Sequence, residues 1–279
     1  MINLQGEKAK TRYLAQTIRA SLVFERQMEQ RGVKLLDSQA RMAAQIYRTT
    51  GSQDEVMVAV ERGSVKWEDL IQKQHLRVGE YFGGKMLRAM KHGMDLPLEL
   101  KDIDRWRLIM RNFIQVHAAK QVVNIQNTTK GLIRRAIRAA ADSGLGNYGI
   151  AKEIYGKISG IGKLTAKVRC RLIARTESHT AANHSTNVAA KIVPFHMLKD
   201  WISAEDERTR PSHFNLGAAA PIEMDERFAA DRCDLEYPGD PTALVEEIAN
   251  CRCTVNYITD ATPKKAIILM PEAISTLFE

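Results

Sequence analysis

Residues 194–213 read PFHMLKDWISAEDERTRPSH, and the character of the sequence changes at this stretch. Before it, apolar side chains recur at spacings of three and four in long runs with few prolines, a pattern that predicts amphipathic helices. After it, β-branched and aromatic residues mix in short segments separated by Pro and Gly, which predicts a few short strands and long loops. The sequence therefore predicts an α+β protein with a long, mostly helical N-terminal region and a small C-terminal α+β unit.

The expected parts are a basic helical arm over residues 1–160, an α+β domain over residues 161–260 and a tail over residues 261–279. We expect two helices within 7–48 that meet near Gly32, and a short helix at 52–62 that is opened by a capping box of Ser52 and Glu55. A further helical stretch is expected at 65–90, with a break near Gly83 and Gly84. The remaining helices are expected at 101–128, 129–141, 149–158 and 164–192. Strands are expected within FHMLKDWI at 195–202 and CRCTVNYIT at 251–259.

The composition is that of a folded protein, since 44% of the 279 residues are hydrophobic and 27% are charged. The sequence contains no run of eighteen apolar residues, and its first residues lack the apolar core of a signal peptide, so we expect neither a membrane span nor secretion. The four cysteines are too few and too unevenly spaced for a disulfide framework. We therefore expect the chain to stay in the cytosol of the cell that makes it.

The charges are divided unevenly along the chain. Residues 1–200 contain 34 basic and 18 acidic residues, whereas residues 201–260 contain 5 basic and 13 acidic residues. The first part is basic enough to attract a polyanion such as DNA. Lys and Arg on solvated helix faces would produce the same charge without any partner, so the charge by itself leaves both interpretations open.

Residues 158–166 read ISGIGKLTA, lie between two expected helices and are similar to the hairpin of a helix-hairpin-helix motif. In such a hairpin, paired glycines let backbone amides approach a phosphate. Lys157, Lys163, Lys167 and Arg169 would add the positive charge for a sequence-independent contact with the DNA backbone. A helix C-cap followed by a turn accounts equally for the two glycines.

The last long helix that we expect has a polar stripe. Arg175, His179 and Asn183 are four residues apart and therefore lie on one helical face. Such a stripe is either solvated or packed against polar groups of the C-terminal unit.

Four motifs follow one another in the second half of the chain: IARTE at 173–177, DERTRPSH at 206–213 after Trp201, PGDP at 238–241 and NCRCT at 250–254. In this order and spacing, over about residues 125–258, they resemble the Mu F-like minor head, or head morphogenesis, proteins of tailed double-stranded DNA phages.

The resemblance implies a structural component of the virion that is made early in head assembly in the host cytoplasm. It implies the portal protein, other head proteins and the packaged double-stranded DNA as partners, and a place inside the head near the portal. It implies no small-molecule substrate. By position, the motif residues of the family are Arg175, Thr176, Glu177, Asp206, Arg210, His213, Asn250, Cys251 and Cys253.

Considered by residue type alone, these residues allow two arrangements. A disulfide between Cys251 and Cys253 would be strained, but both sulfurs could bind zinc with His213, and with Cys233 or an acidic side chain as a fourth ligand. Alternatively, both cysteines share one face of a strand as small buried residues. The polar residues would then form a buried structural network, in which His213 bonds to Glu177 or Asp206, and its members would be Arg175, Thr176, Glu177, Asp206, Arg210, His213 and Asn250.

Two other functions stay open. His213, Asp206, Glu205 and Asn250 are residue types with which metal-dependent nucleases bind a divalent ion, although the acidic unit that contains them would repel DNA without metal and no nuclease signature is present. Alternatively, the chain could be a sequence-independent DNA-binding protein without a phage role, which would bind DNA through its basic half. We expect a structural minor head protein and no enzymatic activity, with zinc as the one cofactor to consider.

Overall fold

The computed structural model describes residues 6–93, 100–160, 164–194 and 196–259. Its helices in the first two thirds of the chain are α1 (Glu7–Thr50), α2 (Gln53–Arg62), α3 (Ser64–Gly79), the π-helical turn η1 (Glu80–Gly84), α4 (Lys85–Gly93), α5 (Leu100–Asp142), α6 (Asn147–Ser159) and α7 (Leu164–Ile192). The remaining elements are β1 (Leu198–Ile202), α8 (Pro211–Ala218), β2 (Ile222–Glu223), β3 (Phe228–Ala229), β4 (Asp234–Leu235), α9 (Val245–Ile248) and β5 (Thr254–Ile258). Long helices followed by a few short antiparallel strands confirm the predicted α+β class.

The chain forms two compact units that interleave along the sequence. The strand-bearing unit comprises Met1–Phe24, Gln74–Phe113 and Arg175–Glu279, and the helical unit comprises Glu25–Lys73 and Ile114–Ala174. Helices α1, α3, α5 and α7 each contribute residues to both units. The units thus do not follow one another along the chain, as a single boundary at residue 160 would require, because different turns of one long helix can enter different cores. The expected tail at 261–279 lies outside the described residues.

The first predicted boundary between helices, near Gly32, is wrong, because α1 continues from Glu7 to Thr50. Gly32 instead allows close packing: a Cβ at this position would lie 3.1 Å from Cys170 Sγ and 3.3 Å from the Trp67 ring. The predicted boundary between Thr128 and Thr129 is also wrong, because α5 is continuous. Each threonine donates its hydroxyl hydrogen bond to the carbonyl four residues earlier, so neither interrupts the helix.

Other local predictions are confirmed. Ser52 is the N-cap of α2, and its side chain accepts a hydrogen bond from the Glu55 backbone N–H. Helix α7 has the predicted bounds, 164–192. The break expected near Gly83 is the π-helical turn η1, where a Cβ on Gly83 would lie 2.5 Å from the Ser185 carbonyl oxygen of α7. Glycine is therefore present at this turn because η1 and α7 approach closely.

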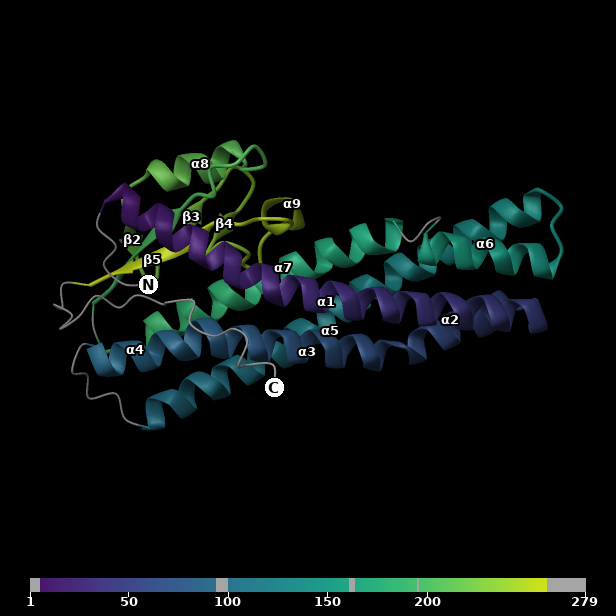
Figure 1. Ribbon diagram of the computed structural model, residues 1–279, viewed down its shortest axis with the longest axis horizontal. Helices are drawn as coiled ribbons and strands as arrows, with labels where there is room; N and C mark the ends of the chain where they lie inside the picture. The colour runs from purple at the N-terminus through teal and green to yellow at the C-terminus, as the bar shows by residue number, and fades with distance from the viewer. Residues whose placement is uncertain (1–5, 94–99, 161–163, 195, 260–279) are drawn as a thin grey trace. The chain divides into compact units, whose positions relative to one another are not determined.

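A three-stranded antiparallel sheet of order β2-β1-β5 organises the strand-bearing unit. In its main register, Leu198 of β1 pairs with Ile258 of β5 and Ile202 pairs with Thr254. Since successive side chains of a strand point to opposite faces, the two faces of β1 have different neighbours. Figure 1 shows α1 and α8 beside this sheet.

On one face of β1, Trp201 contacts His213 of α8, with ring centroids 5.0 Å apart. On the other face, Asp200 pairs with Lys10 of α1 at 2.9 Å, and Ile202 packs against Tyr13 and Leu14 of α1. The two helices thus bury opposite faces of the central strand.

The helical unit has a separate apolar core, built from α1, α2, α3, α5, α6 and the first part of α7. Leu36, Val60, Ile71, Ile133 and Ile154 are fully buried there. In the described residues, none of the helices combines the length and the apolar character that crossing a bilayer requires.

Candidate functional site

The connection between α9 and β5 carries the NCRCT motif, and we call residues 246–253 the CxC segment. Asn250 has φ +61°, in the left-handed region that Asn tolerates better than most residues. Arg175 of α7 donates a hydrogen bond from Nη1 to Asn250 Oδ1, and the Asn250 backbone N–H donates to Thr176 Oγ1 at 3.5 Å. Helix α7 thus positions the turn that directly precedes the two cysteines.

The DERTRPSH loop binds the same segment. Arg210 donates from Nε to the Glu246 carbonyl at 2.7 Å and from Nη2 to the Ala249 carbonyl at 2.8 Å. These carbonyls lie at the end of a helix, where intrahelical partners are lacking. Asp206 pairs with Arg252 Nη1 at 2.8 Å. Five of the seven predicted network residues, Arg175, Thr176, Asp206, Arg210 and Asn250, therefore join at the CxC segment through these contacts, and a sixth, His213, contacts its two cysteines.

His213, Cys251 and Cys253 lie close together at the CxC segment. His213 Nδ1 lies 3.6 Å from Cys251 Sγ and 3.8 Å from Cys253 Sγ. The exposed fractions of the three residues are 1%, 4% and 2%. Their potential ligand atoms all lie within 4.8 Å of one another, so the structure brings together the predicted metal-ligand set.

Glu247 lies on the other side of the His213 ring. Its Oε2 is 3.2 Å from His213 Nε2, a distance typical of an ion pair, although the two atoms are not aligned for a good hydrogen bond. Glu247 is buried and its Oε2 also lies 3.9 Å from Arg210 Nε. Sequence reasoning missed Glu247, because α9 was expected to be part of a loop.

The electrostatics of this cluster follow from burial and from the mutual contact of the thiols. Cys251 donates a hydrogen bond to Cys253, which holds the pKa of Cys253 well below its ordinary value, aided by His213. The same contact, together with burial, raises the pKa of Cys251. Burial, with a further contribution from His213, lowers the pKa of His179 to about 3, so His179 is neutral at physiological pH.

The predicted partners of His213 are wrong. Glu177 Oε2 instead lies 2.9 Å from His75 Nε2, and both side chains are buried. Asp206 pairs with Arg252 rather than with His213. His75 is 102 positions from Glu177 in the sequence, and no local pattern connects them.

His213 also lies on an element that the sequence analysis did not expect. Residues 211–218 form α8, with Pro211 in its first turn. Proline is favoured there because its missing N–H needs no partner and its φ suits a helix. Pro211 was thus the sequence feature from which the start of this helix could have been predicted.

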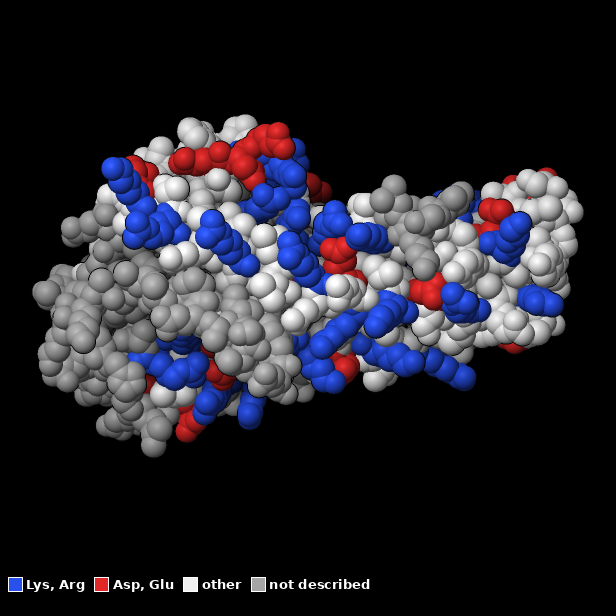
Figure 2. Space-filling view, viewed as in Figure 1, with Lys and Arg blue, Asp and Glu red and all other residues white. Residues whose placement is uncertain are grey.

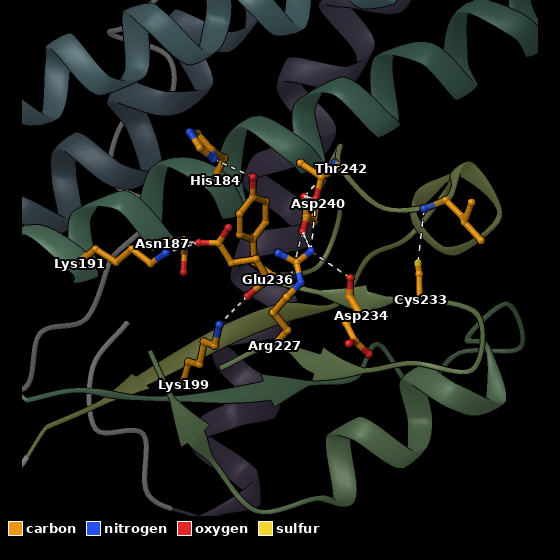
Figure 3. Close-up of polar contacts among 12 residues, drawn as sticks. His184, Asn187, Lys191, Lys199, Arg227, Cys233, Asp234, Glu236, Asp240 and Thr242 are labelled. Atoms are coloured by element: carbon orange, nitrogen blue, oxygen red, sulfur yellow. Dashed lines mark hydrogen bonds and ion pairs between the residues drawn. The ribbon is translucent and has the colours of Figure 1, made fainter. Parts of the chain in front are cut away.

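The PGDP motif forms a second polar cluster, shown in Figure 3. Buried Asp240 accepts hydrogen bonds from the Glu236 backbone N–H at 3.0 Å, from Thr242 and from Arg227 Nη2 at 2.6 Å. Gly239 has φ +82°, and a Cβ there would lie 2.7 Å from the His179 ring. Asp240 therefore orders this loop, and the absence of a side chain at Gly239 lets the loop approach α7 closely.

One face of α7 binds these loops along its length. Thr180 Oγ1 donates to the Gly239 carbonyl at 2.8 Å, His184 contacts the Tyr237 hydroxyl at 2.7 Å, and Asn183 accepts from Thr254 Oγ1 at 3.1 Å. Asn187 and Lys191 both bind the Glu236 carboxylate (Figure 3). Of the two interpretations of the polar stripe, the structure therefore supports packing against the C-terminal loops.

Lys199 of β1 also belongs to the second cluster (Figure 3). Its Nζ donates to the Glu236 carbonyl at 3.0 Å, and the side chain has no exposed surface. Burial lowers the pKa of Lys199 to about 8. The sequence offered no sign that a lysine would be buried at this position.

The predicted DNA-binding residues divide into three groups. Lys157 and Lys167 are exposed, and Lys163 lies outside the described residues. Arg169 does not offer its guanidinium to solvent: Nη2 donates to the Ile125 carbonyl at 2.8 Å and to Thr129 Oγ1 at 3.1 Å, and burial lowers its pKa. Arg169 thus connects α7 to α5 and is a poor candidate for a phosphate contact.

Within the basic part of the chain expected from the sequence, the helical unit contains a basic region larger than the four residues singled out. Residues 114–174 contain 11 basic and 2 acidic residues. Those with exposed side chains include Lys120, Arg134, Arg135, Arg138, Lys152, Lys157 and Lys167. Figure 2 shows that Asp and Glu side chains gather near α8, whereas Lys and Arg are spread along the helices.

Residues 132–256 match the family model described as phage Mu protein F like protein. No curated protein and no solved structure gives a significant match to the chain. The matched range includes the end of α5, all of α6 and α7, and the CxC segment.

Proposed function

We propose that this chain, whose residues 132–256 match the family of phage Mu protein F like proteins, is a structural minor head protein. In this proposal it docks at the portal or at the inner surface of the head and contacts double-stranded DNA without sequence preference during head assembly. The match to this family supports a role in head morphogenesis together with other head components. The site near the portal and the contact with DNA are the parts that need experiments.

The charge of the helical unit supports the DNA contact and is the observation on which it rests. The sequence ranges of this unit contain 19 basic and 10 acidic residues, a net charge of +9. Arg134, Arg135 and Arg138 lie within one turn of α5 and are all exposed. A rigid helix with clustered guanidinium groups suits phosphate contacts, which carry no sequence information by themselves.

The contacts of the motif residues support a structural role. Arg175 and Asp206 bind side chains of the CxC segment, and Arg210 binds its carbonyls. These side chains use their polar atoms to order loops. His213 and Cys253, the groups best suited to chemistry, are 1% and 2% exposed, so a substrate would have little access to them.

Portal association is tested by co-expressing the full chain with the portal protein of the same phage and separating the assemblies by size. We expect the chain to migrate with portal rings. The major capsid protein, expressed without portal, serves as the control for non-specific adhesion. Migration of the chain apart from the portal, or equal migration with both proteins, would contradict portal docking.

The nuclease alternative is tested by incubating the pure chain with plasmid and magnesium, manganese or zinc. We expect the plasmid to stay intact, since Asp206 is paired with Arg252 and His213 is buried. Cleavage that is lost in His213→Ala would show that the protein is an enzyme.

A further inference from the structure

The CxC segment and α8 meet at a cluster that the proposed function leaves unexplained. Two cysteine sulfurs and one imidazole nitrogen, from residues about 40 positions apart, converge in a buried place. Structural networks need hydrogen-bonding groups, but they do not require two thiols beside one histidine nitrogen. We propose that His213, Cys251 and Cys253 bind one zinc ion that joins α8 to the segment before β5.

The distances suit this metal. Tetrahedral zinc has Zn–S bonds of about 2.3 Å and Zn–N bonds of about 2.0–2.1 Å, so bound sulfur and nitrogen atoms lie roughly 3.6 Å apart. The observed distances from His213 Nδ1 to the two sulfurs are 3.6 and 3.8 Å. Both nitrogen–sulfur distances thus already nearly match those of a zinc tetrahedron, and all three atoms lie within 4.8 Å of one another.

Hydrogen bonds alone account poorly for the same arrangement. The Nδ1 of a neutral imidazole has one lone pair, so it can accept a single good hydrogen bond, and a thiol is a weak donor. Here two sulfurs approach that one nitrogen. A chain of hydrogen bonds from Cys251 to Cys253 and on to His213 Nδ1 would use only one of the two sulfur contacts at this nitrogen. A metal ion between the three atoms instead uses a lone pair from each of them and so explains why all three converge.

Glu247 occupies the position of an outer-shell partner. Histidines that bind metal through one nitrogen commonly donate the other N–H to a carboxylate, which orients the ring. Glu247 Oε2 lies 3.2 Å from His213 Nε2 on the side of the ring away from the sulfurs. Zinc would balance two thiolates, and Arg210, 3.9 Å from Glu247, would balance its carboxylate, so the buried group would have no net charge.

The backbone supports the ligand set as well. Asn250 adopts its left-handed conformation directly before Cys251, and Arg175 binds its side chain. Trp201 contacts the edge of the His213 ring and limits its rotation. Cys233 is not a fourth ligand, because its sulfur accepts a hydrogen bond from the Leu244 N–H at 3.4 Å and it lies outside the cluster.

The test measures zinc in the full chain, purified with a histidine-free tag and without chelator. We expect one equivalent of zinc per chain by elemental analysis, and loss of that zinc in Cys251→Ser, Cys253→Ser and His213→Asn. Cys233→Ser is the matched control and should retain the full equivalent. Less than a tenth of an equivalent after incubation of the wild-type chain with zinc, or full retention in both Cys251→Ser and Cys253→Ser, would overturn the proposal.

A second measurement covers variants that fail to fold. Cobalt added to the metal-free wild-type chain should give the charge-transfer absorption of thiolate ligands and a visible spectrum of four-coordinate cobalt. Glu247→Gln should weaken zinc affinity roughly 10- to 100-fold in competition with a chelator, whereas the exposed neighbour Glu246→Gln should leave it unchanged. Absence of the thiolate band, or equal affinities in the two variants with no zinc in the wild type, would refute the site.

Discussion

Arg175 of α7 and Arg210, directly before α8, both bind the CxC segment. Arg210 bonds to two carbonyls at the end of α9, and Arg175 bonds to the side chain of Asn250, whose backbone has an unfavourable φ. Local strain of this kind persists only where surrounding contacts determine it. These two arginines therefore stabilise the geometry on which the cysteine pair depends.

Arg175→Ala tests the contribution of this residue to stability. Arg175 is half-buried and donates to an amide oxygen, so we expect a loss of about 1–2 kcal/mol in the free energy of unfolding. Arg171→Ala, one turn earlier on α7, removes an exposed pair with Glu29 and should cost about 0–1 kcal/mol. Thermal unfolding midpoints compare the variants, and equal shifts would show that Arg175 has no special role.

Lys199 predicts a dependence of stability on pH. Its folded pKa, about 8, is below the unfolded value of 10.5, so the unfolded chain binds more protons between these values. Stability should therefore rise with pH across this window, by at most roughly 3 kcal/mol relative to Lys199→Met. Lys191→Met, which removes an exposed partner of Glu236 but keeps Lys199, is the control and should retain the rise of stability with pH. Parallel pH profiles for wild type and Lys199→Met would contradict this prediction.

At the scale of elements, helix α7 is central to the strand-bearing unit. Its polar face binds the loops of the PGDP and NCRCT motifs. At Ser185, its backbone lies close to Gly83 of η1, and its carbonyl accepts a hydrogen bond from Trp106 Nε1 at 3.1 Å. A helix that packs on several sides leaves little room for extra atoms. Substitutions at its closest contacts should therefore be more harmful than substitutions on solvated helices.

Gly83→Ala tests this close approach. The added methyl group would lie 2.5 Å from the Ser185 carbonyl oxygen, and the backbones would have to separate. We expect a loss of roughly 1–3 kcal/mol in stability. Gly156→Ala on α6, where nothing lies within 4 Å, should instead stabilise by about 0.5–1 kcal/mol. Calorimetry of both variants gives the comparison, and a neutral Gly83→Ala would mean that η1 can move away from α7 at little cost.

At the scale of the whole molecule, the charge belongs to one of the two units. The helical unit has a net charge of +9, whereas the strand-bearing unit has 22 basic and 23 acidic residues. Of the excess of 16 basic residues in 1–200, 9 belong to the helical unit; the other 7 belong to the strand-bearing unit, where the acidic residues after position 200 offset them. A division of this kind would let one unit attract DNA while the other, nearly neutral, is available for protein contacts.

Binding of unrelated DNA duplexes at several salt concentrations tests where the contact lies. If Arg134, Arg135 and Arg138 each contact a phosphate, replacing all three by Ala should reduce the slope of log affinity against log salt by roughly 2 to 3. The control replaces three exposed basic residues of the strand-bearing unit, Lys8, Arg12 and Arg19, and should leave the slope nearly unchanged. Equal effects would place the contact elsewhere, and a strong preference for one duplex would favour a regulatory DNA-binding protein.

Sequence alone determined the features that depend on near neighbours. The bounds of α7, the Ser52 cap and the strands around Trp201 and Val255 follow from periodicity and capping, whereas the sequence left two arrangements open for His213 and the two cysteines. Tertiary structure decided the partners of buried charges and the division into units: Glu177 met His75, Arg169 turned inward, and Gly32 served packing instead of a break. The physical reason is range, because helix and turn preferences act over a few residues, whereas a buried ion pair or a close contact forms between segments that only the complete packing of the chain brings together.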